Sequence, residues 1–216
     1  MSFQSNEKCV ALYRMENVND SSGNSHTLIN NGTITFITGK FSNCANLGNP
    51  NSSKYFSHDE LGVNLSGVHG FSSWVYLLAA PGSSLISIFC DWRSTTGTAR
   101  YVIPYYQNDA GTMRLAINNQ GTITSTAYTL PLNTWFKIDY TNNAINGYIY
   151  INSILRLTAP NGSTSNSNNA LGIGGYYNGA ANGFIHGYLE ESIFYNYHRT
   201  AEAIRKMYAF QTGRLV

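Results

Sequence analysis

Paired carboxylates are the first residues of this sequence that could do chemistry. Glycoside hydrolysis needs two carboxyl groups facing each other across the scissile bond, about 5–9 Å apart. Glu190 and Glu191 are adjacent, as are Asp59 and Glu60. Neighbouring residues of a strand point to opposite faces of a sheet, so we expect neither pair to act together. The sequence therefore predicts a protein that is not an enzyme.

Other chemistries lack the residues that they need. The five histidines are scattered, no serine lies in a Gly-x-Ser-x-Gly elbow, and no phosphate-binding glycine loop follows a predicted strand. A net charge of +2 from dispersed basic residues predicts no nucleic-acid partner. The sequence has no run of about 18 apolar residues, so we expect no membrane span.

Aromatic residues indicate a binding function instead. The chain has sixteen tyrosines, and sugar sites combine an aromatic platform with polar side chains. Tyr148 and Tyr150 alternate with Ile149 and Ile151, so the tyrosines face away from the core if the isoleucines lie in it. Five further candidate ligand-binding residues lie near loops rich in Asn and Gly: Trp92, Tyr105, Tyr106, Tyr176 and Tyr177. The alternatives are that these rings are half-buried strand formers or form a protein interface.

The pattern predicts that strands position these residues. The 216-residue chain has few charged residues, and its runs alternate between apolar and polar side chains, as in Met113–Ile117. Turn signals such as Asn30–Gly32 separate the runs. We expect one all-β domain over residues 1–216, with a surface loop at Asn161–Asn169.

The period of the pattern changes near the C-terminus. Leu189, Ile193 and Tyr195 recur at the even spacing of a strand, whereas apolar residues after Thr200 recur at helical spacing. Thr200 is a good N-cap, and Gly213 can end a helix. We predict a short helix near residues 200–210, packed at the edge of a two-sheet sandwich.

The segment Gly187–Tyr208 resembles, position for position, the closing segment of laminin G-like, concanavalin A-like jelly-roll modules. Further segments resemble other landmarks of that family in the right order: Val10–Glu16 with Asp20–Asn24, Gly39–Phe41 with Cys44–Leu47, Phe71–Val75, and Leu130–Trp135 with Ile149–Asn152. The resemblance spans nearly the whole chain. It implies a two-sheet antiparallel jelly-roll sandwich, in which Trp74 and Trp135 have structural roles.

The resemblance also implies a structural calcium ion, since many of these modules hold one between the opening turn and the closing strand. Asp20, Asn24 and Glu190 are its candidate ligands, and no other cofactor is expected. The alternative is that Asp20 caps its own turn and Glu190 is solvated or paired. His198 and Arg199 replace the family's Ala-Leu before the helix, which predicts a weaker helix contact or a corner open to a partner.

The cysteines and the N-terminus bear on the compartment. Cys9, Cys44 and Cys90 lack metal-ligand spacing, so we expect buried thiols, with a Cys9–Cys44 bridge left open. The first eight residues lack the apolar core of a signal peptide, which predicts cytoplasmic synthesis.

We interpret the chain as a recognition or structural module of a virion, such as a phage capsid decoration, head-fibre or tail protein. The alternative is a carbohydrate-binding module of a larger secreted or cell-surface protein. The expected partners are a surface glycan, a capsid or tail protein, or further copies of the chain. The expected location is a virion or extracellular surface.

Overall fold

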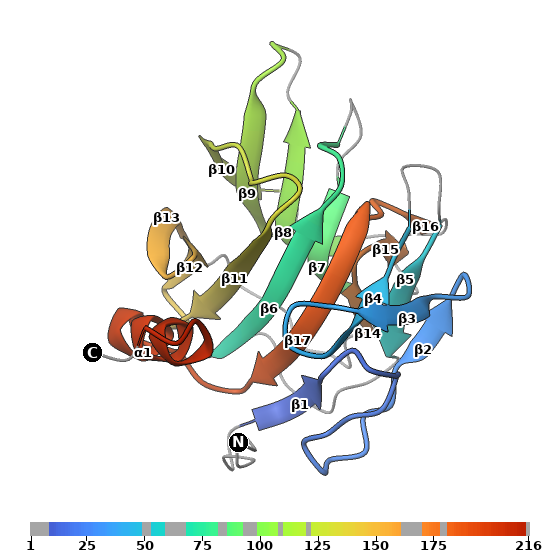
Figure 1. Ribbon diagram of the computed structural model, residues 1–216. Coiled ribbons are helices and arrows are strands. Elements are labelled where there is room, and N and C mark those ends of the chain that lie inside the picture. The colour runs from blue at the N-terminus through green and yellow to red at the C-terminus, as the bar shows by residue number, and fades with distance from the viewer. Residues whose placement is uncertain are drawn as a thin grey trace.

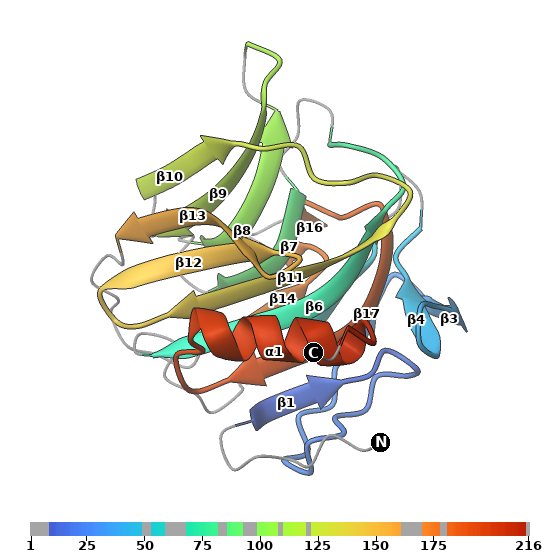
Figure 2. The same ribbon diagram turned by 60° about the vertical axis from the view of Figure 1, so that its left-hand side comes forward.

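The strands form two stacked antiparallel sheets, as Figures 1 and 2 show. The computed structural model describes residues 9–48, 53–58, 68–81, 86–92, 99–107, 110–119, 122–160, 170–177 and 181–214. The larger sheet has eight strands, in the order β13-β12-β11-β6-β17-β4-β3, and β1 also pairs with β17. The smaller sheet has seven, in the order β10-β9-β8-β7-β14-β5-β2. The prediction of a two-sheet antiparallel sandwich is confirmed.

The strands of the larger sheet are β1 (Cys9–Tyr13), β3 (Thr35–Thr38), β4 (Asn43–Asn46), β6 (His69–Leu77), β11 (Trp135–Asn142), β12 (Asn146–Ile151), β13 (Ile154–Pro160) and β17 (Gly187–Tyr195). Those of the smaller sheet are β2 (Ile29–Asn31), β5 (Tyr55–His58), β7 (Ile86–Trp92), β8 (Ala99–Gln107), β9 (Met113–Asn119), β10 (Thr122–Ala127) and β14 (Ala170–Ile173). A separate ribbon joins β15 (Tyr176–Tyr177) to β16 (Ala181–Asn182).

The core lies between the sheets, where aromatic rings join the two layers. The rings of Phe71 on β6 and Phe89 on β7 stack with centroids 4.8 Å apart, and Phe194 on β17 lies 5.0 and 4.9 Å from them. All three side chains are buried. Aromatic pairs at such separations add to the free energy of simple area burial, so they tie the two sheets together.

Strand alternation defines a second face of the larger sheet, which we call the outer face because it points away from this core. Ile149 and Ile151 lie in the core, so Tyr148 and Tyr150 project to the outer face, as predicted. On β6, Val75 is a core residue, whereas Trp74 and Tyr76 project outward.

A β-bulge in β17 breaks this alternation. The register against β6 shifts between Glu190 and Ile193, and Glu191 has a φ of +52°. Before the shift Leu189 faces the core, but after it Phe194 does, and Ile193 joins a small separate cluster with Leu12. The even spacing of Leu189, Ile193 and Tyr195 predicted a strand correctly, but these residues do not share one face, because an extra residue reverses the parity after Glu190.

The described cysteine side chains are free thiols. Cys9 is half-buried and Cys44 is buried, and neither forms a disulfide. Burial raises the pKa of both thiols to about 11. The side chain of Cys90 lies outside the described residues.

The helix predicted after β17 is α1 (Ala201–Gln211). It lies against the outer face over β6 and β11 (Figure 2), so the prediction that it packs at the edge of the sandwich is wrong. Thr200 caps it, since its side-chain oxygen accepts a hydrogen bond from the backbone N–H of Ala203 at 3.2 Å. The helix ends at Gln211, and Gly213 follows the C-cap Thr212 with a φ of +69°, while the N–H of Arg214 donates to the carbonyl of Ala209. No helix in the described ranges has the length and apolar character needed to cross a bilayer.

Arg199 anchors the start of α1 through a buried ion pair. Its guanidinium lies 2.6 Å from the Asp139 carboxylate on β11 and 4.7 Å from the centre of the Tyr195 ring. The Arg199 residue is 2% exposed. The prediction that this corner is open to a partner is therefore wrong at Arg199, because the arginine is buried and paired. A helix contact weaker than leucine would give stays a prediction.

We expect the single replacement Arg199→Leu to lower the free energy of unfolding by about 3–5 kcal/mol, because it leaves the Asp139 charge buried without its partner. Asp139→Leu combined with Arg199→Leu should recover most of this loss, since it removes both charges. Urea denaturation of the two variants and the parent protein measures this. A double variant as unstable as the single one would contradict the explanation.

Candidate functional site

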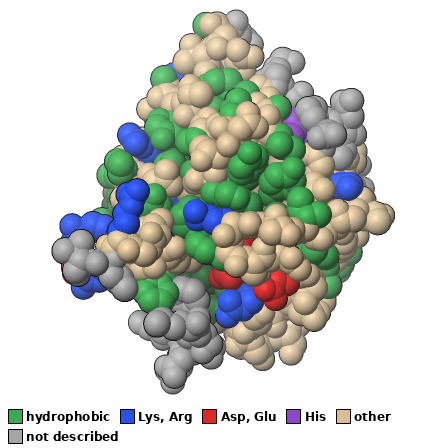
Figure 3. All heavy atoms as spheres, viewed as in Figure 1, with side chains coloured by type: hydrophobic (Ala, Val, Ile, Leu, Met, Phe, Trp, Pro, Cys, Tyr) green, Lys and Arg blue, Asp and Glu red, His purple; other side chains and the backbone are tan. Residues whose placement is uncertain are grey.

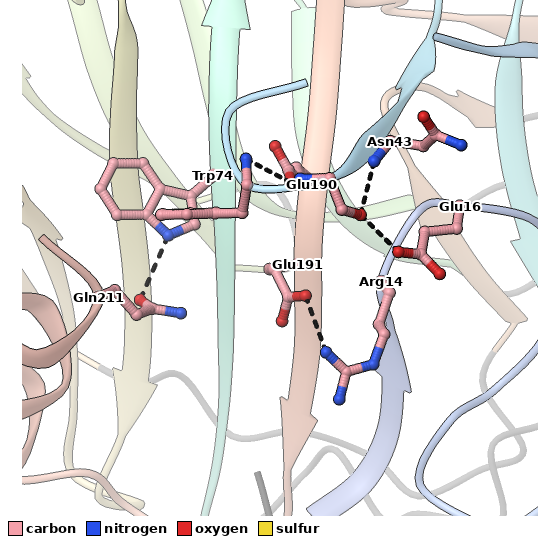
Figure 4. Close-up of polar contacts among 9 residues, drawn as sticks. Arg14, Glu16, Asn43, Trp74, Glu190, Glu191 and Gln211 are labelled. Carbon is pink, nitrogen blue, oxygen red and sulfur yellow. Dashed lines mark hydrogen bonds and ion pairs between the residues drawn. The ribbon is translucent and has the colours of Figure 1, made fainter. Parts of the chain in front are cut away.

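Trp74 is the residue around which the outer face is organised. Its ring stacks on Tyr208 of α1 at 5.9 Å and meets Phe41, in the turn between β3 and β4, edge to face at 5.4 Å. Its indole N–H donates to the side-chain oxygen of Gln211 at 3.2 Å (Figure 4). The Lys40 ammonium lies 4.9 Å from the ring centre. These contacts leave Trp74 1% exposed, so the structural role predicted for it agrees with its burial.

Lys137 lies beside Trp74 and is completely buried. Its ammonium nitrogen donates to the same Gln211 oxygen and lies 5.7 Å from the Trp74 ring centre. Burial lowers the pKa of Lys137 to about 8, and the nearby Asp139 carboxylate opposes part of that fall. The C-terminal end of α1 therefore covers a lysine whose charged form is disfavoured by desolvation.

Glu190 anchors the turn between β3 and β4. Its carboxylate accepts backbone N–H groups from Lys40, Phe41 and Ser42 at 2.6, 2.9 and 2.8 Å. A Cβ at Gly39 would lie 2.6 Å from the same carboxylate, so glycine is needed for this close approach. The prediction that Glu190 is paired therefore describes its contacts, although its partners are backbone amides rather than a cation.

Glu191 belongs to the same polar region, which corrects the prediction that adjacent acids on β17 lie on opposite faces. The bulge turns the Glu191 carboxylate toward Arg14, whose guanidinium lies 3.3 Å away (Figure 4). Burial raises the pKa of Glu191, the Arg14 guanidinium opposes that rise, and the Glu190 carboxylate adds to it through like-charge repulsion. Both residues are buried and bonded to protein groups, which leaves neither facing an open surface.

The predicted calcium ligands all form hydrogen bonds within the chain. The Asp20 carboxylate accepts backbone N–H groups of Leu12, Ser22 and His26, and the Asn24 amide donates to the Val10 carbonyl. Each Asp20 oxygen accepts two hydrogen bonds once the Ser22 hydroxyl is included, and the Asn24 amide nitrogen is turned toward the carbonyls of β1, so both side chains are engaged within the opening turn. In the part of the chain that the structure describes, no group of three or more His, Cys, Asp or Glu side chains could hold a metal. Asp20 caps its turn, and its amide bonds lower its pKa against the opposing effect of burial. Calcium binding by this protein stays a prediction.

A cluster of three aromatic rings lies further along the outer face. Trp135 on β11 and Tyr188 on β17 are both register partners of Tyr76 on β6, the strand between them. We call these residues the aromatic triad. Ring centroids are 5.5 Å apart for Tyr76–Trp135, 5.3 Å for Tyr76–Tyr188 and 6.5 Å for Trp135–Tyr188. All three residues are half-buried, so part of each is accessible to solvent.

Neutral polar residues extend the triad across the sheet. Asn46 on β4 is the register partner of Tyr188, and Thr35 on β3 is the partner of Asn46. Both residues have solvent-accessible surface. Figure 3 views this face and shows hydrophobic side chains gathered over the upper parts of β6 and β17. Aromatic rings beside amide and hydroxyl groups are the combination that sugar recognition uses.

The structure distributes the predicted ligand-binding residues over several places. Tyr148 is half-buried, with its hydroxyl accepting from the Asn143 amide at 3.2 Å and its ring 5.8 Å from that of His198. Tyr150 projects to the outer face as predicted but is only 7% exposed. Tyr105 lies in the core, so its interpretation as a surface residue is wrong: its strand parity sends the ring inward, and its hydroxyl accepts the Leu130 N–H. Tyr106 is partly exposed on the smaller sheet.

The side chains of Trp92, Tyr176 and Tyr177 lie outside the described residues. The sequence analysis missed Tyr76 and Tyr188 and gave Trp135 a structural role alone. A signal was present, since Tyr76 has the same strand parity as Trp74, and Tyr188 alternates with the core residue Leu189. The sequence does not show that β11, β6 and β17 are neighbours, and only their pairing brings the three rings together.

The comparisons with known proteins agree with the fold described above. A family model described as the concanavalin A-like lectin/glucanases superfamily matches residues 50–205. The chain belongs to this superfamily. The family resemblance predicted from the sequence is thereby confirmed. No curated protein sequence matches the chain.

Solved structures of this superfamily's fold include binding domains. Domain 4 of AbnA, a GH43 extracellular arabinanase from Geobacillus stearothermophilus solved with arabinotriose, has a TM-score of 0.69 and 17% identity, covering 93% of this chain and 98% of that one. The binding domain of botulinum neurotoxin DC was solved with rat synaptotagmin II and with SialylT. Both structures have a TM-score of 0.71, with 13% and 14% identity, covering 96% and 94% of this chain and 52% and 51% of theirs. This chain thus spans about half of the toxin chains, and at these identities the likeness shows the fold alone.

We expect Glu190→Gln to lower the free energy of unfolding by about 1.5–3 kcal/mol, because hydrogen bonds to a charged acceptor are lost. Amide exchange at Lys40, Phe41 and Ser42 should accelerate as the turn loosens. Glu202→Gln is the matched control, since Glu202 is an exposed acid on α1 paired with Lys206. Equal effects of the two changes on stability would contradict the anchoring role.

Lys137 should give the protein a distinctive pH dependence. Its folded-state pKa lies below that of an unfolded lysine, so between about pH 8 and the ordinary lysine value the unfolded chain binds more protons. The stability of the parent protein should therefore rise across this window relative to that of a Lys137→Met variant. Denaturation of both proteins at pH 7, 8, 9 and 10 measures the difference, and parallel curves would show that Lys137 is not the cause.

Proposed function

We propose that this chain is a non-catalytic carbohydrate-binding module, with the aromatic triad as its sugar platform. The observation that carries the proposal is the partly exposed row of Trp135, Tyr76 and Tyr188, which continues into Asn46 and Thr35. Rings stack on the apolar face of a sugar, and the neighbouring amide and hydroxyl groups bond to its hydroxyls. The complexes of similarly folded domains with arabinotriose and SialylT support this function.

The state of the acidic residues supports a non-catalytic role. The pair of acids on β17 is buried and bonded to the chain, with Glu190 held by backbone amides and Glu191 held by Arg14. A glycoside hydrolase needs an acid and a base that reach the scissile bond from opposite sides. Neither carboxylate belongs to the triad, so the proposed sugar platform and the acids have separate roles.

The virion role stays a prediction. In that role the outer face would be displayed to a glycan or to a capsid or tail protein. A symmetric oligomer measured by native mass spectrometry would favour it, whereas a monomer that binds sugar would favour the carbohydrate-binding module.

We expect Tyr188→Ala and Trp135→Ala each to weaken glycan binding by about 1–3 kcal/mol, the usual loss for an aromatic anchor. This corresponds to an affinity change of about 5- to 150-fold. A glycan array identifies the ligand, and isothermal titration calorimetry then measures the affinity of each variant.

Tyr148→Ala is the matched control, because Tyr148 is a half-buried tyrosine on the same outer face but outside the triad. It should leave binding unchanged. If Tyr148→Ala loses binding while Tyr188→Ala keeps it, the sugar site lies at Tyr148 and Tyr150, the tyrosines predicted from the sequence, and not at the triad. Near-UV circular dichroism confirms that each variant is folded.

A further inference from the structure

The shape of the triad limits the kind of glycan that it can accept. Its rings are tilted against one another, by 65° for Tyr76–Trp135, 37° for Tyr76–Tyr188 and 40° for Trp135–Tyr188. Rings at such angles do not form one plane, so they cannot all lie flat on the surface of a crystalline polymer. The largest centroid separation is 6.5 Å, which makes the platform compact rather than extended.

The neighbouring structure closes the platform on one side. The next outward residue along β6 is Trp74, which is 1% exposed because α1 and the turn between β3 and β4 cover it. Phe41 in that turn is 47% exposed, and its ring meets the Trp74 ring edge to face. A glycan chain running along β6 from Tyr76 toward Trp74 therefore meets surface that is already covered, which closes the platform in that direction.

The charged residues of the outward row next to the triad are buried and hydrogen-bonded within the protein. In register, the adjoining outward row of the sheet contains Lys137, Trp74 and Glu190. Lys137 and Glu190 are 0% and 1% exposed, and both are hydrogen-bonded inside the chain. The ammonium of Lys40 is exposed but lies over the rings of Trp74 and Phe41, at 4.9 and 5.2 Å from their centres. The row of the triad itself continues into neutral Asn46 and Thr35.

We propose that the triad recognises a mono- or disaccharide unit of a neutral, soluble glycan. This inference rests on the proposed carbohydrate-binding function and specifies its ligand class. The tilted rings exclude the flat face of an insoluble polysaccharide, and centroids no more than 6.5 Å apart offer stacking surface for only one or two sugar rings. An acidic sugar gains no compensating charge from the row of neutral residues, so its carboxylate would be desolvated at a cost.

The test compares glycans of defined length and charge on the full chain. Calorimetry with arabino- and cello-oligosaccharides of one to six units should show affinity that stops rising at the disaccharide. Sialyllactose and oligogalacturonides should bind at least about tenfold more weakly than the neutral sugars, the size of a single lost anchor. Microcrystalline cellulose should not deplete the protein from solution.

The outcomes separate this inference from the function on which it rests. Affinity that keeps rising to the hexasaccharide, tighter binding of the acidic sugars, or capture by cellulose would overturn the inference while leaving a carbohydrate-binding module. Binding to none of these sugars and to nothing on a broad glycan array would overturn the proposed function itself.

Two variants locate the effect. Tyr188→Ala should lose the short neutral sugars, whereas Lys40→Met should bind them as the parent protein does. Lys40→Met keeps an apolar side chain over Trp74 and removes only the charge. Loss of binding in Lys40→Met would show that the ammonium contacts the ligand, and it would overturn the assignment to neutral sugars.

Discussion

The burial of Trp74 on the outer face is the contact on which the rest of this structure depends. A tryptophan facing away from the core must be covered, because its large apolar ring is costly to leave in water. Two separate segments cover it, the helix α1 through Tyr208 and Gln211 and the turn after β3 through Phe41. These two segments divide the outer face into a part around Trp74 that they cover, which we call the closed part, and a part around Tyr76 that stays partly accessible to solvent.

The closed part is polar, and its charges are balanced within the chain. Lys137, Asp139 and Arg199 are nearly inaccessible to water, yet each has a partner of suitable chemistry. Buried ion pairs contribute little net stability but penalise any other arrangement, because a displaced partner leaves a bare charge. We infer that this polar layer specifies where α1 sits, while the apolar contacts of Trp74 supply much of the energy that holds it there.

The bulge at Glu191 has a separate consequence for function. It brings the carboxylates of Glu190 and Glu191 into one region and engages them with the turn after β3 and with Arg14. Glu190 and Glu191, the adjacent acids considered first as catalytic candidates, therefore stabilise the fold through these contacts. The same bulge moves Phe194 into the core, where it meets Phe71 and Phe89.

The sequence by itself determined the fold class and the elements with a clear local signal. Strand alternation placed Ile149 and Ile151 in the core, and the change of period at Thr200 predicted α1, because both depend on short-range geometry. Tertiary structure alone decided which outward-facing rings stay open. Tyr150 and Tyr188 both project from the larger sheet, yet the first is buried and the second belongs to the triad. The outcome depends on which strands become neighbours and where α1 packs, and contacts between residues so distant in the chain leave no periodic trace in it.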